Sequence, residues 1–373
     1  MRTPTGTGAT LSSREAATDA AQTRLPELDV LRGTAIVAVV YLHAYFKAWP
    51  GVPPQEVLAV HAIHLFAHGA VPVFLFVSGF LLARERVTSP GDFAWRKLRR
   101  IYVPMLIWMG VAFVYRAHLQ GSVNGDILRS LALFDISGQY YYLAVLLILS
   151  TVFYAIGRTR LAGSVTLPVA AFVLNLAAIA YYQRTGVSGT GLSSILAYRN
   201  PVVWVFFFGF GLFAGRRAPS LAWTERWLWP GLAAMGGIAV LYFVIGERYA
   251  YPVSYFGVQI FLFSCCGLVC YPALIRMLLR SRLGTALIAP VRWLSQYAFP
   301  IYLVHMPLFI GWLTLKTVTE PGYFSNEYMK LMTALFVVGF AGALTFSIAV
   351  AQLLRQSAPI LIGVQVRRSP QGG

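Results

Sequence analysis

Charged side chains are scarce in this sequence. Only 12% of its 373 residues are Asp, Glu, Lys or Arg, whereas 58% are hydrophobic. A soluble protein of this length would need far more polar surface in contact with water. Apolar stretches close to membrane-crossing length recur along the chain. The sequence therefore predicts an all-α integral membrane protein, a polytopic bundle of helices.

Acidic residues are the rarest charged group, with 13 Asp and Glu against 30 Lys and Arg and a net charge of +17. No carboxylate lies well inside an apolar stretch. Proton-coupled transporters usually carry membrane-embedded carboxylates, so the shortage of carboxylates weakens the interpretation of this chain as such a transporter. The distribution of the basic residues argues against a nucleic-acid-binding protein, because Lys and Arg fall mainly in alternate loops, as in a membrane protein with a fixed orientation. We expect the lipid bilayer, and no nucleic acid, as a partner.

Cysteine is also rare. The three cysteines, Cys265, Cys266 and Cys270, lie together in one apolar stretch. They cannot form an extracellular disulfide framework there, and we interpret them as small buried hydrophobic residues.

About ten apolar stretches are expected to cross the membrane, with helix interruptions at Pro72 and Pro300. The stretches are 30–47, 57–83, 100–117, 139–157, 163–183, 201–215, 227–246, 254–279, 293–315 and 329–354. An even number puts both termini on one side. The segments on that side carry most of the Lys and Arg, which predicts a multi-pass protein of the cell (plasma or inner) membrane with both termini in the cytoplasm.

The chain is expected to hold one folded domain. Residues 1–27 are rich in Ala, Thr and Ser without an apolar core and predict a disordered cytoplasmic tail. Residues 28–356 form the predicted transmembrane domain, and 357–373 a second cytoplasmic tail. No loop is long enough for another folded domain.

Arg32 and His43 are separated by eleven residues in the first apolar stretch. That separation is within about 20° of three full helical turns, so both side chains project from one face, about 16 Å apart along the axis. An arginine at the centre of a membrane helix costs about 2.5–3.5 kcal/mol, which makes such a pair a candidate functional site. The alternative is that Arg32 anchors the helix at lipid headgroups and His43 bonds a neighbouring helix.

The two residue types suit different parts of one reaction. The guanidinium of Arg32 can bind phosphate through two parallel hydrogen bonds. A neutral imidazole such as that of His43 can accept a proton from an attacking hydroxyl. Carboxylates that could assist His43 come only from predicted outer loops, at Glu56, Asp135 and Glu247.

Two further motifs allow more than one interpretation. Ser78 and Gly79 form a small pair within an apolar helix, where close helix packing is the favoured role. The loop before the third stretch carries Arg96, Lys97, Arg99 and Arg100. This basic cluster could anchor the topology, contact anionic lipid or bind a polyanionic cofactor such as coenzyme A.

The remaining histidines favour structural roles. His61, His64 and His68 have helical spacing, so a metal site is geometrically possible, but no cysteine or carboxylate completes a ligand set. We expect no metal, and interpret them as interfacial histidines beside a polar cavity. His305 could hydrogen-bond a neighbouring helix or line a polar cavity.

Four elements, taken in order, resemble the membrane acyltransferase-3 family. They are Leu28-Asp29-x-x-Arg32-Gly33 followed by His43, then Ser78-Gly79-Phe80, then Arg96-Lys97-x-x-Arg100, and finally Ile301-Tyr302-Leu303-Val304-His305. The resemblance implies an integral membrane O-acyltransferase that moves an acyl group, most simply acetyl, from cytoplasmic acyl-CoA. The acceptor would be a hydroxyl of a glycan, a surface polysaccharide or a similar molecule. No cofactor would be bound permanently, and acyl-CoA (acetyl-CoA) would be a co-substrate.

The resemblance also implies roles for single residues. His43 and Arg32 would be catalytic, with His43 a base or a transient acyl carrier. Acyl-CoA would be held by Arg96, Lys97, Arg99 and Arg100, and the supporting residues would be Asp29, Ser78, Gly79, Phe80 and His305. Lys97 departs from the family pattern, in which two arginines are usual. The chain resembles the short, membrane-only members, without the hydrolase-like domain of longer relatives. The alternative function is a membrane transporter or flippase for a glycan-lipid or small polar solute.

Overall fold

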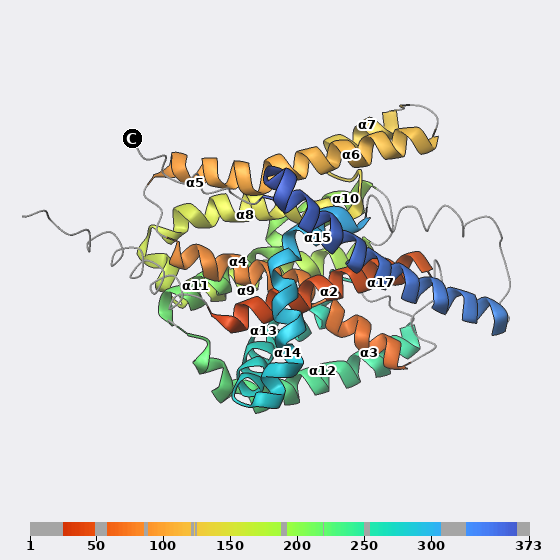
Figure 1. Ribbon diagram of the computed structural model, residues 1–373. Helices are drawn as coiled ribbons and strands as arrows, with labels where there is room; N and C mark the ends of the chain where they lie inside the picture. The colour runs from red at the N-terminus through yellow and green to blue at the C-terminus, as the bar shows by residue number, and fades with distance from the viewer. Residues whose placement is uncertain are drawn as a thin grey trace, which may run out of the picture.

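The structure is a computed structural model that describes residues 25–48, 58–85, 89–120, 123, 125–187, 192–218, 220–249, 254–306 and 326–363. Over these ranges the chain forms helices and turns and no strand (Figure 1). Six helical segments there are long and apolar enough to cross a membrane, or seven if the bent pair Leu192–Arg199 and Pro201–Arg217 is one span. The predicted all-helical membrane fold is confirmed, while ten crossings and cytoplasmic termini remain predictions.

Within each described range the helices follow one another with short connections. In chain order they are α2 (Pro26–Ala48), α3 (Leu58–Ala67), α4 (Ala70–Arg84), α5 (Pro90–Lys97), η2 (Leu98–Tyr102), α6 (Val103–Gln120), α7 (Gly125–Ala132), η3 (Gly138–Tyr140), α8 (Tyr141–Gly157), η4 (Arg160–Gly163), α9 (Thr166–Arg184), α10 (Leu192–Arg199), η5 (Pro201–Trp204), α11 (Val205–Arg217), η6 (Ala222–Trp227), α12 (Leu228–Tyr249), α13 (Val258–Leu279), α14 (Arg282–Leu294), η7 (Ser295–Tyr297), α15 (Ala298–Val304), α17 (Asn326–Ser357) and η9 (Pro359–Ile362).

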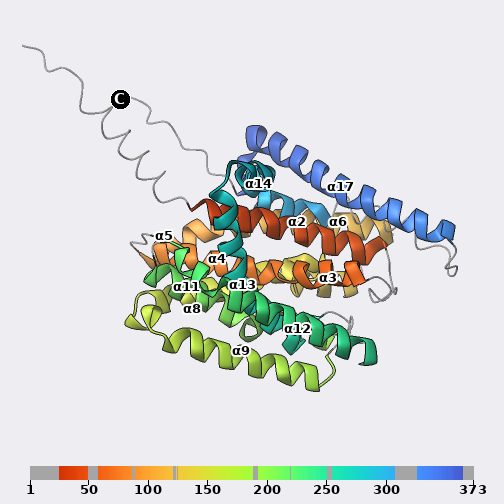
Figure 2. The same ribbon diagram turned by 90° about the horizontal axis from the view of Figure 1, so that it is seen from below.

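Helix α2, which carries Arg32 and His43, lies in the middle of the bundle (Figures 1 and 2). It contacts α3, α4, α13, α14, α15 and α17. Its apolar residues are buried on several faces, which a helix of nearly uniform hydrophobicity permits. Both residues of the predicted face therefore point into protein, where an ionisable group can find polar partners.

Close helix approach explains two glycines of the sequence motifs. A Cβ at Gly79 would collide with the Phe208 carbonyl of α11, and one at Gly33 would collide with the Val291 carbonyl of α14. In membrane bundles, glycine lets the backbones of neighbouring helices approach closely enough to touch. The Ser78-Gly79 pair thus sits where α4 packs against α11.

Both prolines expected to interrupt helices have breaks directly before them. A proline lacks the N–H that would bond the carbonyl four residues earlier, and its ring crowds that carbonyl. For Pro72 the fourth residue back is His68, where a turn separates α3 from α4. For Pro300 it is Gln296, which lies in the 3₁₀ turn η7. The prolines therefore divide these segments where the sequence indicated.

The basic cluster lies on a helix and not in the loop that we expected. Ser89 caps α5 by accepting a hydrogen bond from the Asp92 N–H at 3.0 Å, and Pro90 follows in the first turn. The helix continues through the π turn η2 into α6, and Pro90–His118 is one candidate span. The apolar stretch begins later than the helix, because capping residues and not hydrophobicity decide where a helix starts.

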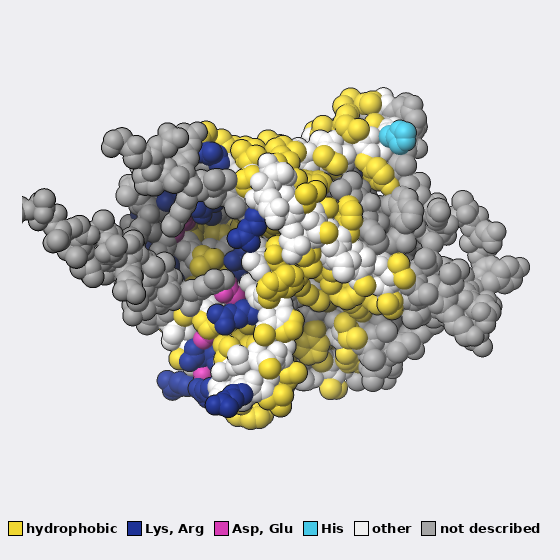
Figure 3. Space-filling view, in the orientation of Figure 1, with side chains coloured by type: hydrophobic (Ala, Val, Ile, Leu, Met, Phe, Trp, Pro, Cys, Tyr) yellow, Lys and Arg dark blue, Asp and Glu magenta, His cyan; other side chains and the backbone are white. Residues whose placement is uncertain are grey.

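The two ends of the described chain lie together. Arg32, near the start of α2, and Gly363, after η9, line the same cavity. The indole N–H of Trp108 in α6 donates to the Leu361 carbonyl at 3.0 Å, so packing continues to the end of η9. Figure 3 shows Lys and Arg side chains gathered on the left side of the molecule. This is the end of the bundle at which α2 begins in Figure 1.

Candidate functional site

Two cavities follow one another along α2. The first, the basic cavity, has a volume of about 350 Å³, and its polar lining residues are Arg32, Ser78, Glu85, Arg96, Lys97, Arg100, Tyr142 and Tyr302. The second, the histidine cavity, has a volume of about 360 Å³, and its polar lining residues are His43, His68, Asp135, Gln139, Tyr141, Tyr142, Ser194, Tyr198, Arg199, Tyr255 and Tyr302. Arg32 and His43, predicted to share one face of a helix, thus line different cavities.

The basic cavity has a strongly cationic lining. It gathers Arg32 from α2, Arg96 and Lys97 from α5, and Arg100 from η2. The one carboxylate among its lining residues, Glu85, forms an ion pair with Arg96 at 3.2 Å. One carboxylate cannot neutralise four cations. The excess positive charge, much of it on guanidinium groups, suits a polyphosphate ligand.

Arg99 does not line the basic cavity, unlike the other three cations of its cluster. Its guanidinium lies over the ring of Trp95, 5.4 Å from the ring centroid, and that tryptophan is 57% exposed. Lys97, the residue that departs from the family pattern, has its ammonium 5.4 Å from the ring centroid of Phe93. The helix directs these neighbouring side chains to different sides, which residue order alone does not reveal.

The supporting residues also separate. Ser78 lines the basic cavity, whereas Asp29, Gly79 and Phe80 line neither cavity. Asp29 is buried in the first turn of α2. Phe80 is fully buried, with the Arg84 guanidinium 5.5 Å from its ring centroid. These three residues therefore belong to the packed bundle around the cavities.

His43 meets His305 in the structure. The two ring centroids are 5.3 Å apart. His305 is 0% exposed, and its Nδ1 lies 2.9 Å from the Ile301 carbonyl oxygen. Because a carbonyl only accepts, Nδ1 carries a proton in this contact, and in the neutral imidazole Nε2 then carries the lone pair. The ring of His305, with its Nδ1–H bonded to the backbone, therefore lies against the predicted base.

Of the carboxylates considered for His43, Asp135 lines the histidine cavity. Its carboxylate is paired with the Arg199 guanidinium at 3.0 Å. Arg199 also donates to the Phe134 carbonyl at 2.9 Å, and Phe134 has a φ of 56°, a strained value for a bulky residue. The Asp135 carboxylate therefore helps to stabilise this turn through its ion pair with Arg199. The side chains of Glu56 and Glu247 lie outside the described residues.

Tyr142 and Tyr302 line both cavities and form the wall between them. Their rings meet edge to face with centroids 5.5 Å apart. The Tyr302 hydroxyl donates to the Gln139 carbonyl, and Tyr142 interacts with the Ser78 side chain. We did not single out Tyr142, Gln139 or Arg199 from the sequence. The signal that could have drawn attention is the run of tyrosines at 140–142 at the start of an apolar stretch.

Among the described residues no group of three or more potential metal ligands occurs, and the absence of a metal at the histidines of the second stretch stays an expectation. His68 lines the histidine cavity and its Nδ1–H donates to the His64 carbonyl at 2.8 Å. His64 has its Nδ1 3.3 Å from the Tyr41 hydroxyl. The His61 side chain lies outside the described residues.

Comparison with protein families matches the acyltransferase domain of the acyltransferase-3 type to residues 25–352. This match covers most of the chain. The protein belongs to the acyltransferase-3 family. It is therefore a membrane acyltransferase, an enzyme that requires an acyl donor and an acceptor. The matched region of this family member includes every polar residue that lines the two cavities. No significant match was found among curated proteins or solved structures.

Proposed function

We propose that the protein transfers an acetyl group from cytoplasmic acetyl-CoA to a hydroxyl of a glycan, surface polysaccharide or similar acceptor. One observation carries the proposal. The cationic cavity with Arg32 and the cavity with His43 meet at a shared wall of two tyrosines. A two-substrate acyl transfer needs such an arrangement, because a charged donor and a neutral acceptor have to meet at one reacting carbon.

The donor would lie in the basic cavity. The phosphates of coenzyme A would bind Arg32, Arg96 and Arg100, with Lys97 adding a point charge. The thin pantetheine arm would then extend along α2 toward His43, which is about 16 Å further along the helix axis. Ser78, which lines this cavity, would lie beside the arm.

The acceptor would lie in the histidine cavity. Its lining combines aromatic rings, such as Tyr198 and Tyr255, with polar groups of Gln139 and Ser194. A sugar ring offers apolar faces that stack on aromatic rings and hydroxyls that hydrogen-bond to amides and hydroxyls. This chemistry favours a hydroxylated acceptor over an apolar one.

In the reaction, His43 would act as the general base. Its imidazole accepts the proton of the acceptor hydroxyl while the oxygen attacks the thioester carbonyl carbon. A carbon–oxygen bond forms, the carbon–sulfur bond breaks, and the proton finally reaches the departing coenzyme A thiolate. The products are an ester and free coenzyme A. His305 in its neutral form would orient His43 by accepting its other N–H at Nε2.

The decisive experiment uses purified protein in lipid nanodiscs with acetyl-CoA labelled in the acetyl group. We expect slow release of free coenzyme A, faster when extracted cell-surface glycans are added, with label passing to the glycan. The His43→Ala protein is the control. Equal thiol release by both folded proteins would overturn the proposal. A transporter would bind or move its solute without consuming acetyl-CoA.

Mass spectrometry of cell-surface glycans from cells with and without the protein identifies the acceptor. We expect the loss of an acetyl ester from one glycan class. A glycan profile that does not change would exclude surface glycans as acceptors.

A further inference from the structure

The wall between the two cavities consists of two rings from helices distant in the sequence. Tyr142, in the first turns of α8, is 7% exposed, and Tyr302, in α15, is 5% exposed. Each ring lines the basic cavity on one side and the histidine cavity on the other. Their edge-to-face contact, with centroids 5.5 Å apart, is a favourable aromatic geometry.

Both rings are held in place by polar contacts. The Tyr302 hydroxyl donates to the Gln139 carbonyl at the start of α8, and Tyr142 interacts with Ser78 of α4. A third bond fastens the two supporting helices, because the Tyr140 hydroxyl donates to the Leu303 carbonyl at 3.1 Å. The wall is therefore fixed by contacts outside the ring pair and does not depend on the aromatic contact alone.

The position of the wall matters because the cavities hollow the bundle along α2. Their volumes are about 350 and 360 Å³, and charged or polar side chains line part of each, beside apolar ones. If they joined, they would form a polar path through much of the length of the bundle. Polar paths across a bilayer conduct water and ions, and narrow apolar constrictions stop this by excluding water.

We propose that Tyr142 and Tyr302 form a barrier that prevents the two cavities from joining into a water-filled path across the membrane. The same barrier yields to the thioester end of the donor, so that the acyl group enters the histidine cavity while bulk water does not. Only this second statement rests on the proposed function. The barrier itself is a property of the membrane-embedded chain.

The test reconstitutes the full chain in liposomes that contain a pH-sensitive dye, and measures proton leak after an external pH step. We expect Tyr142→Ala, Tyr302→Ala and above all the double variant to raise the leak rate several-fold over wild type. Tyr142→Phe and Tyr302→Phe, which keep the rings, should leave the leak near the wild-type rate.

The matched control is Tyr242→Ala. Tyr242 is also 5% exposed but lies in α12 and lines neither cavity. We expect it to leave the leak unchanged. If the folded double variant leaks protons no faster than wild type, the proposal that the two tyrosines form a barrier is wrong. It is equally wrong if Tyr242→Ala leaks as much, because the leak would then report general loosening of the bundle.

A second readout separates the barrier from the proposed function. Hydrolysis of acetyl-CoA is measured in detergent without acceptor, and acetyl transfer with acceptor. We expect Tyr142→Ala and Tyr302→Ala to raise the ratio of hydrolysis to transfer, because water reaches the thioester. A wild-type protein that never cleaves acetyl-CoA would remove the proposed function, while the proton leak would still decide the barrier. An increased leak with an unchanged ratio of hydrolysis to transfer would overturn the statement that the wall keeps water from the donor.

Discussion

At the scale of single residues, the rings of His43 and His305 lie side by side. The sequence left two structural roles open for His305, a hydrogen bond to a neighbouring helix or the lining of a polar cavity, and its role as a supporting residue stays a prediction. The structure puts its ring 5.3 Å from that of His43, so it is a neighbour of the predicted base. The two residues have to be tested together.

The first prediction concerns His43. The His43→Gln protein should lose turnover by roughly 10²–10⁴-fold, the usual contribution of a general base, because glutamine forms hydrogen bonds but does not accept the proton. Folded yield and thermal melting should stay at the wild-type level. The measurement is label transfer by purified protein, and full activity of a well-folded variant would contradict the base assignment.

The second prediction concerns His305 as a positioning residue. His305→Leu should lower kcat and alter the pH profile of kcat, whereas His305→Gln, which can still accept a hydrogen bond, should keep more activity. In a His43→Ala background the same changes should have no further effect, since the base that they position is gone. Additive losses in that double-mutant cycle would show a purely structural role.

The third prediction uses two neighbouring arginines that the structure separates. Arg100→Ala should raise the KM for acetyl-CoA by roughly tenfold, because a charged hydrogen bond worth about 1.5 kcal/mol is lost from donor binding. Arg99→Ala should leave that KM unchanged, because Arg99 lies over Trp95 and not in the basic cavity. Equal effects of the two variants would mean that the cluster acts only as diffuse positive charge.

At the scale of helices, one arginine of α13 joins three segments. The Arg276 guanidinium pairs with Glu27 at the start of α2 and with Glu225 of η6 at 2.8 Å. Arg280 pairs with Glu225 as well. The hydrogen bond from Arg276, followed by that from Arg280, lowers the pKa of the Glu225 carboxyl. This network fastens the end of α2 from which Arg32 projects.

The fourth prediction follows from this lowered pKa. A carboxyl whose pKa is lowered by folding stabilises the folded protein at any pH above the pKa that it has in the unfolded chain. This contribution is lost as the pH falls through the lower pKa of the folded state. Wild type should therefore lose thermal stability as the pH drops below the ordinary value of 4.5. Glu225→Gln should melt lower than wild type at pH 7 and depend less on pH in the acid range. Melting curves in detergent that remain parallel for the two proteins would contradict this account.

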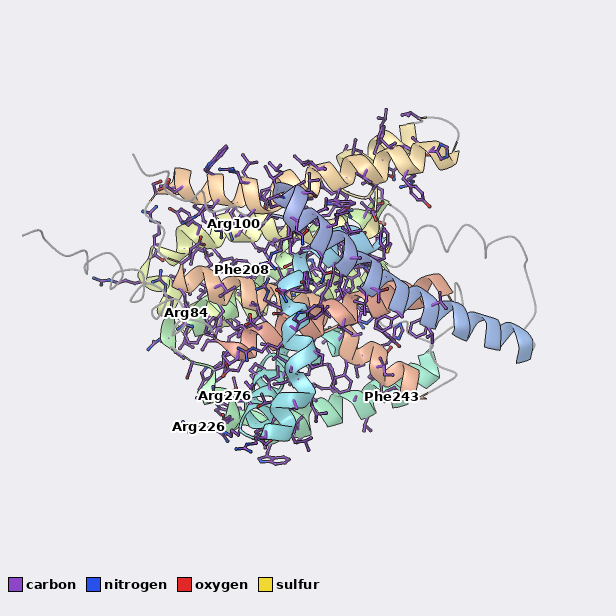
Figure 4. All side chains as sticks on the ribbon, in the orientation of Figure 1. Arg84, Arg100, Phe208, Arg226, Phe243 and Arg276 are labelled. Carbon is purple, nitrogen blue, oxygen red and sulfur yellow. The ribbon has the colours of Figure 1, made fainter. Side chains whose placement is uncertain are left out.

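At the scale of the whole molecule, the charged residues divide the bundle into two ends. Figure 4 shows Arg84, Arg100, Arg226 and Arg276 at the left end, and Phe243 at the other. Basic residues are retained on the cytoplasmic side during insertion. The basic cavity lies at this end, so the orientation of the bundle decides which compartment would supply the donor that we propose for this cavity.

The fifth prediction is the orientation itself. A cysteine introduced at Ser89 should react with thiol reagents only after the cytoplasmic side becomes accessible, and one at Gly51 should react from the outside. The three native cysteines lie within α13 and can be replaced beforehand. Labelling of both positions from one side would contradict the arrangement of the first spans.

Local patterns in the sequence determined the class of protein and much of α2. Hydrophobic content identifies membrane helices, and the helical period puts Arg32 and His43 on one face, because both signals depend on residues close together in the chain. The same is true of the breaks before Pro72 and Pro300. The family motifs then pointed to acyl transfer, which the family match supports.

Only the tertiary structure decided which residues meet. Periodicity says which face of a helix a residue occupies, but not which neighbour covers that face. It could not show that His305 lies against His43, that Tyr142 and Tyr302 line both cavities, or that Arg99 lies outside the basic cavity. These contacts join segments more than a hundred residues apart or depend on a π turn. They are settled by the packing of the whole bundle around α2.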